Sequence, residues 1–168
     1  MMRGPRMIAT CFGIGDLPGA PGTWASVAAI PLTWALHMAG GFWAVGPATV
    51  ALTLLGYWAT ARYIEGRAPE QSRDPSEVVI DEVVGMMIAL WPLSIGLTVM
   101  GAEWYQWPWP GWVLGFLLFR FFDILKPPPV SWADRMEGPL GVMLDDIVAG
   151  VLTALIAVVA AGIAHGWL

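Results

Sequence analysis

Five long apolar stretches constrain the fold of this 168-residue chain more than any other feature. They are Thr23–Ala39, Phe42–Tyr63, Val83–Ala102, Gly111–Leu125 and Ile147–Trp167. A helix that crosses the hydrocarbon core of a bilayer needs about 20 residues, a length that the second, third and fifth stretches approach. Only 12% of the residues are charged, whereas soluble domains carry roughly 25%. The sequence therefore predicts one all-α domain over residues 1–168, with about five membrane-embedded helices, of which the first and fourth are short enough to be tilted or half-buried.

The basic residues predict the orientation of these helices. When the five stretches are threaded through a membrane, every Lys and Arg falls on one side or at its edge: Arg3, Arg6, Arg62, Arg67, Arg73, Arg120, Lys126 and Arg135. The positive-inside rule makes this side cytoplasmic. The other side carries Trp104, Tyr105, Trp107 and Trp109, which are typical of an interfacial aromatic belt. The net charge of -5 disfavours nucleic acid as a partner.

The acidic residues share this asymmetry, since only Glu103 of the 13 lies on the aromatic side. Most have ordinary explanations. Asp74 suits an N-cap, Pro75 the first position of a helix and Glu77 a capping box, so we expect the third helix to begin there. Five acids lie at the ends of apolar stretches, where ionisable residues are costly and usually functional: Asp81, Glu82, Asp123, Asp145 and Asp146.

The chemistry of these five carboxylates predicts a cation site. Carboxylates forced together repel one another unless a cation or proton intervenes. A set rich in oxygen, without sulfur or histidine, suits Mg²⁺, or Mn²⁺, better than zinc. Arg120, three residues before Asp123, and Lys126 are available for phosphate oxygens. We therefore expect a metal-dependent phosphatase site for a lipid phosphate at the cytoplasmic face, although Arg120 and Asp123 can also form a simple ion pair.

Other catalytic classes find little support. His37 and His165 lie on the opposite side, the single Cys11 suits a small buried apolar residue, and there is no GxSxG motif. Metal-assisted hydrolysis remains, with either water or an aspartate as nucleophile. Two alternatives stay open. The same acids can bind the ion carried by a small cation transporter, although such acids belong near the bilayer midplane, or the chain is an interaction subunit without chemistry.

A glycine-rich segment, GIGDLPGAPGTWAS, precedes the first apolar stretch. Its Gly and Pro residues allow a tight turn whose amides can face an anion. Thr23 or Ser26 can cap the helix that follows. A capped loop and a phosphate cradle both remain possible for this segment.

Four motifs together resemble the phosphatidylglycerophosphatase A family. They are GIGDLPGAPGTWAS, DPSEVVIDEVVG, FRFFDILKPPPVSWAD and GVMLDDIVAG, and they occur in the family's order. The resemblance implies a compact helical bundle around one central helix. It also implies a Mg²⁺-dependent enzyme of the bacterial inner membrane that acts from the cytoplasmic face on the phospholipid phosphatidylglycerophosphate.

The resemblance also carries roles to individual residues. It matches Asp81–Glu82 and Asp145–Asp146 to the family's two acidic pairs, Asp123 to its helix-end acid, Lys126 to its Lys-Pro and Thr23 to its hydroxyl. We expect metal binding by Asp81, Glu82, Asp145 and Asp146, catalysis by Asp81, Glu82, Asp123 and Asp146, and substrate binding by Thr23, Arg120 and Lys126. One departure is Gly138-Pro139-Leu140-Gly141 in place of the family's Gly-Gly-x-Gly, which puts the flexibility of that loop in doubt.

Overall fold

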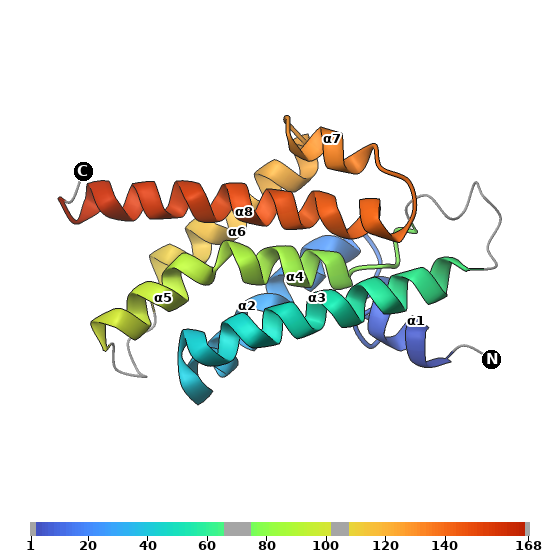
Figure 1. The fold of residues 1–168 in the computed structure, drawn as a ribbon, viewed down its shortest axis with the longest axis horizontal. Helices are drawn as coiled ribbons and strands as arrows, with labels where there is room; N and C mark the ends of the chain where they lie inside the picture. The colour runs from blue at the N-terminus through green and yellow to red at the C-terminus, as the bar shows by residue number, and fades with distance from the viewer. Residues whose placement is uncertain (1–2, 66–74, 102–107, 167–168) are drawn as a thin grey trace.

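The computed structural model describes residues 3–65, 75–101 and 108–166, and this part of the chain is all-helical without a strand. Figure 1 shows the helices packed into one bundle. In chain order they are α1 (Arg3–Ala9), the short 3-10 helix η1 (Ile14–Asp16), α2 (Pro21–Gly40), α3 (Phe42–Ile64), α4 (Ile80–Ala89), α5 (Trp91–Met100), α6 (Trp109–Leu125), α7 (Val130–Asp134) and α8 (Pro139–Ala164).

Helix α4 is the centre of the bundle. Every residue of this helix except Glu82 is buried, as expected for a helix that is apolar on nearly all sides. Helices α2, α3, α6 and α8 surround it. The central helix implied by the family resemblance is therefore α4.

The third apolar stretch is broken, whereas the sequence predicted one continuous helix over Val83–Ala102. Helix α4 ends at Ala89, α5 begins at Trp91, and the two helices are bent by 41°. Pro92 explains the break, because proline has no backbone N–H to donate and its ring displaces the preceding turn. The Trp91-Pro92 dipeptide was the sequence signal for this bend.

Two described helices, α3 and α8, are long and apolar enough to cross a membrane, and the bent α4–α5 pair makes a third if it counts as one span. Large apolar side chains are exposed on α3, α6 and α8, among them Leu54, Leu117 and Leu155. Exposed apolar surface on this scale marks a surface that contacts lipid or another protein. The predicted aromatic belt falls mostly at residues 102–107, outside the described residues.

Helix α8 is longer at its start than the sequence predicted. It begins at Pro139, eight residues before the apolar stretch at Ile147, because Gly138 has a positive φ of 79° and Pro139 is preorganised for the first helical position. Asp145 and Asp146 consequently lie inside a continuous helix. At the same end of the bundle lie α1 and the end of α3, while the end of α8 and the α2–α3 turn lie at the other (Figure 1).

Candidate metal and anion site

The first acidic pair, Asp81 and Glu82, lies in the first turn of α4. This helix begins at Ile80, so the prediction of a start at Pro75 was wrong. Residues 75–79 form a separate turn, in which the Val78 amide donates to the Pro75 carbonyl at 2.8 Å, and make tertiary contacts. The Val79 amide donates to the carbonyl of Ala9 in α1 at 2.9 Å, and these contacts outweigh a local capping preference.

Glu77 has a different role from the predicted cap. Its Oε1 accepts a hydrogen bond from the Tyr63 hydroxyl at 2.8 Å, which ties the approach to α4 to the end of α3. Asp74, the other predicted cap, lies outside the described residues.

The two acidic pairs have the same local geometry. Asp81 Oδ1 accepts a hydrogen bond from the Glu82 amide at 3.0 Å, and Asp145 Oδ1 accepts one from the Asp146 amide at 3.0 Å. In each pair, therefore, one oxygen of the first carboxylate is held by the backbone.

Close contact between α4 and α8 brings the two pairs together. A Cβ atom on Gly150 would lie 2.3 Å from the Gly85 carbonyl oxygen, and one on Gly85 would lie 2.6 Å from the Asp146 carbonyl oxygen. Such distances exclude any larger side chain. Small residues are the usual means by which two helix backbones approach closely in membranes.

Three carboxylates form the centre of the site. Ligand oxygens of Asp81, Glu82 and Asp146 all lie within 4.8 Å of one another. Asp81 is 5% exposed and Asp146 4%. Among the described residues no donor reaches Glu82 Oε2 or Asp146 Oδ1. Buried, unpaired carboxylate oxygens are costly, and a hard divalent cation with oxygen ligands would satisfy them. The donor set therefore fits Mg²⁺ or Mn²⁺.

Two basic side chains border this cluster, each held by an acid. Arg120 Nη1 and Asp123 Oδ2 are 2.5 Å apart, and the spacing of three had placed the two residues on one face of α6. Lys126 Nζ donates to Asp145 Oδ2 at 2.8 Å and also contacts Asp134. Asp145, predicted as a fourth metal ligand, lies outside the group of three.

The environment of Lys126 keeps it charged. Burial lowers the pKa of this ammonium group, but hydrogen bonds and attraction from Asp134 and Asp145 outweigh burial, so its pKa lies above the ordinary value. Arg120 differs in having a guanidinium nitrogen, Nε, that is buried and has no hydrogen-bond acceptor among the described residues. Both cations border the cluster. The buried Nε–H of Arg120 is available to donate a hydrogen bond to an anion.

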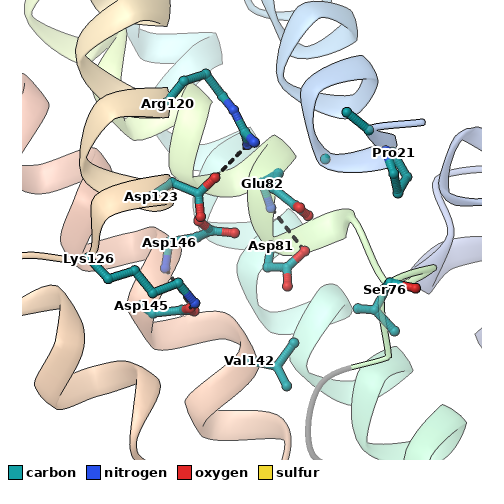
Figure 2. A pocket seen from close by; sticks show the side chains of 13 residues that line it. Pro21, Ser76, Asp81, Glu82, Arg120, Asp123, Lys126, Val142, Asp145 and Asp146 are labelled. Carbon is teal, nitrogen blue, oxygen red and sulfur yellow. Dashed lines mark hydrogen bonds and ion pairs between the residues drawn. The ribbon is translucent and has the colours of Figure 1, made fainter.

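The five carboxylates of the two acidic pairs and Asp123, together with Arg120 and Lys126, line one pocket of about 260 Å³. Figure 2 shows Arg120 and Pro21 on opposite sides of Glu82 in this view, with Lys126 beside Asp145. The lining residues are Ala20, Pro21, Gly22, Ser76, Val78, Asp81, Glu82, Arg120, Asp123, Lys126, Val142, Asp145 and Asp146. The structure thus brings to one place all five carboxylates and both basic residues that the sequence singled out.

The glycine-rich segment contributes backbone rather than a hydroxyl to this pocket. Pro21 and Gly22 begin α2 and line the pocket, whereas Thr23, the next residue, is not among the lining residues. A Cβ on Gly22 would lie 2.0 Å from Glu82 Oε1, so a larger residue there would displace the Glu82 side chain from its present position. Neither predicted hydroxyl caps α2, because the N-cap is Ala20 and Ser26 Oγ donates to the Gly22 carbonyl at 2.8 Å.

Sequence reasoning did not predict six of the lining residues individually: Ala20, Pro21, Gly22, Ser76, Val78 and Val142. The Pro-Gly pair was a usable signal, since it opens a helix directly after a glycine-rich loop. Ser76 was overlooked because the sequence placed it in the first turn of a helix that in fact begins at Ile80. No local pattern distinguishes Val142 from other apolar residues of α8.

Comparison with known proteins gives a consistent result. The family model described as Phosphatidylglycerophosphatase A matches residues 7–161. Proteins named Phosphatidylglycerophosphatase A are similar to this chain: the one from Escherichia coli is 34% identical over 157 residues (88% of this chain and 78% of the relative). The one from Haemophilus influenzae is 32% identical over 152 residues (89% and 84%).

A further relative has a different name. A Bacteroides thetaiotaomicron protein that carries the provisional name phosphatidylinositol-3-phosphatase is 38% identical over 160 residues, which cover 93% of this chain and 92% of the relative. No solved structure matches the chain.

Proposed function

The chain belongs to the phosphatidylglycerophosphatase A family, a family of lipid phosphatases, and on this premise we propose that it removes the terminal phosphate of phosphatidylglycerophosphate in a metal-dependent hydrolysis, which leaves phosphatidylglycerol. One observation carries the proposal. A single pocket combines three buried carboxylates within 4.8 Å of one another with the side chains of Arg120 and Lys126. Carboxylates for a cation and bases for phosphate oxygens are the two requirements of this reaction.

Asp81, Glu82 and Asp146 would hold the Mg²⁺, or Mn²⁺, ion. A divalent cation bound there would supply charge neutralisation at the phosphate and a water of lowered pKa. Arg120 would bind phosphate oxygens through its planar guanidinium and Lys126 through its point charge. Asp123 would then act mainly by orienting Arg120, since Asp123 Oδ2 lies 2.5 Å from Arg120 Nη1. Asp145 would orient Lys126 in the same way, since its Oδ2 lies 2.8 Å from Lys126 Nζ. Thr23, one residue beyond Gly22, remains a prediction for the substrate-binding set.

We further propose that the pocket faces the cytoplasm from the inner membrane. Arg6, Arg62, Lys126 and Arg135 belong to the elements at the pocket end of the bundle, which supports this orientation through the positive-inside rule. In this arrangement α3 and α8 span the bilayer, and α2, α6 and the bent α4–α5 pair are embedded beside them. The pocket then lies at the depth of the lipid headgroups.

Phosphate release from two purified lipids tests the proposal. Phosphatidylglycerophosphate is one, and phosphatidylinositol 3-phosphate is the other, because one relative is named for it. We expect release from phosphatidylglycerophosphate that EDTA abolishes and Mg²⁺ restores. Activity that survives EDTA would contradict the metal-dependent mechanism. Release from the inositol lipid alone would contradict the proposed substrate while leaving the phosphatase chemistry in place.

A further inference from the structure

A lipid phosphate can reach this pocket only if its acyl chains stay in an apolar environment. Moving a CH₂ group from hydrocarbon into water costs about 0.8 kcal/mol, so two long chains cannot leave the membrane. The pocket of about 260 Å³ is lined largely by charged side chains and cannot hold them. The chains must therefore leave the pocket along an apolar surface that adjoins it. This inference rests on the proposed function and concerns where those chains lie.

Helices α2 and α6 both contribute residues to the lining of the pocket. Pro21 and Gly22 open α2, while Arg120 and Asp123 lie in the last two turns of α6. The two helices run antiparallel from there and meet again at Trp34 and Trp112, whose rings are 5.7 Å apart. Trp34 is 13 residues beyond Pro21, about 20 Å along a helix. A stretch about 20 Å long thus lies between the pocket and this aromatic contact.

Apolar side chains are exposed along this stretch. Trp34 lies on the side of α2 that faces α6. Val27 is seven residues, or about two helical turns, before Trp34, so it lies on the same side. On α6, Val113 is seven residues before Arg120 and lies on the same side as Arg120 for the same reason. Val27 is 43% exposed and Leu117 of α6 is 59% exposed. We name Val27, Val113 and Leu117 the α2–α6 flank.

The edge of the pocket away from Arg120 and Pro21 carries polar groups beside Val142 (Figure 2). Ser76 is exposed there, and Lys126 is paired with Asp134 and Asp145. An acyl chain on that edge would have to pass the charged pairs of Lys126, whereas the α2–α6 flank continues from Arg120 along apolar side chains. We propose that the acyl chains of the substrate lie along the α2–α6 flank, so that the lipid enters the pocket sideways from the leaflet with its phosphate leading.

Blocking the flank tests this inference. Val27→Trp places a large ring on the flank, and Val151→Trp is the matched control, since Val151 of α8 is also 43% exposed and does not line the pocket. The two substrates are long-chain phosphatidylglycerophosphate in mixed micelles and its deacylated, water-soluble headgroup. We expect Val27→Trp to lower the ratio of kcat/KM for the lipid to that for the headgroup by about tenfold. Val151→Trp should leave that ratio unchanged.

Two results would overturn the inference: an unchanged ratio in Val27→Trp, or the same fall in both variants. If Val27→Trp does not accumulate as folded protein, Leu117→Trp makes the same test from α6. Failure of the proposed function has a different signature, because the unmodified protein would then release phosphate from neither substrate. Hydrolysis of both substrates with an unchanged ratio would reject only the sideways entry.

Discussion

Gly85 and Gly150 hold α4 and α8 in backbone contact, because a Cβ atom on Gly150 would lie 2.3 Å from the Gly85 carbonyl oxygen. This contact lies next to Asp146, whose carbonyl oxygen is 2.6 Å from the position of a Cβ on Gly85. The crossing therefore sets the separation between Asp81–Glu82 on one helix and Asp145–Asp146 on the other. Packing of two small residues thus determines the geometry of the candidate metal site.

Gly150→Ala should damage both stability and activity. The added methyl group must push α4 and α8 apart, and overpacking of this kind costs about 1–3 kcal/mol. Thermal unfolding in detergent and phosphate release measure the two effects. Gly96→Ala is the control, because nothing lies within 4 Å of a Cβ at that helical position and replacing a helical glycine by alanine usually stabilises by roughly 0.5–1 kcal/mol. Equal melting temperatures for the two variants would contradict the packing argument.

Asp146→Asn should abolish metal binding. Asp146 is one of three carboxylates within 4.8 Å of one another, and replacing it removes a charged ligand while keeping its shape. We expect Mn²⁺ affinity, followed by the electron paramagnetic resonance of the free ion, to fall at least about 100-fold. Glu65→Gln removes an exposed carboxylate that pairs with Arg62 and should leave the affinity unchanged. Tight Mn²⁺ binding by Asp146→Asn would show that the ion lies elsewhere.

Arg120→Lys should weaken binding of the phosphate even though it keeps the charge. Lysine lacks the planar fork that lets arginine contact Asp123 and a phosphate group together. We expect kcat/KM to fall by roughly tenfold or more, mainly through KM. Arg62→Lys is a suitable comparison, since Arg62 forms an exposed pair with Glu65 away from the pocket. If Arg120→Lys had the same kcat/KM as the unmodified enzyme, the role of Arg120 would be limited to its ion pair with Asp123.

Lys126→Met should reduce stability in a manner that depends on pH. The pKa of Lys126 is raised in the folded protein, so its stabilisation is complete below the unfolded pKa of about 10.4 and is lost as pH rises through the folded value. We expect a loss of about 1–2 kcal/mol at pH 7, reduced by the partial exposure of the side chain. Thermal unfolding of both proteins at pH 7 and pH 11 measures this. The loss of stability caused by Lys126→Met should be smaller at pH 11 than at pH 7. An equal difference at both values would reject the assignment.

Cys11 should resist alkylation in the folded protein. Burial, followed by the nearby charge of Glu82, raises the pKa of this thiol from its ordinary value of 9.0 to about 12. Since only the thiolate reacts, the rate with iodoacetamide at pH 8 should be about a thousandfold below that of an ordinary thiol. Unfolding in detergent and urea should restore ordinary reactivity. Rapid labelling of the folded protein would show that this thiol is ionised more readily than its surroundings indicate.

The five carboxylates and two bases of the pocket were identifiable from the sequence. The energetic cost of placing a charge beside an apolar segment depends only on the neighbouring sequence. A charged residue beside a long apolar stretch is unfavourable wherever the chain leads, so Asp81 and Asp146 stand out without a structure. The spacing of Arg120 and Asp123 similarly predicted that they share a helix face, since residues three apart on a helix are neighbours. Helix boundaries were less accessible, because residues 75–79 follow tertiary contacts with α1 and α3.

The sequence by itself determined an all-helical chain rich in apolar segments, the polar end of the bundle and the side chains that meet there. These follow from hydropathy and from spacing along single helices. Only the tertiary structure decided that Asp81, Glu82 and Asp146 form one group while Asp145 pairs with Lys126. It also placed the backbone of Gly22 against Glu82. The physical reason is that these relationships depend on how separate helices pack, above all on the contact between Gly85 and Gly150, which lie 65 positions apart in the chain.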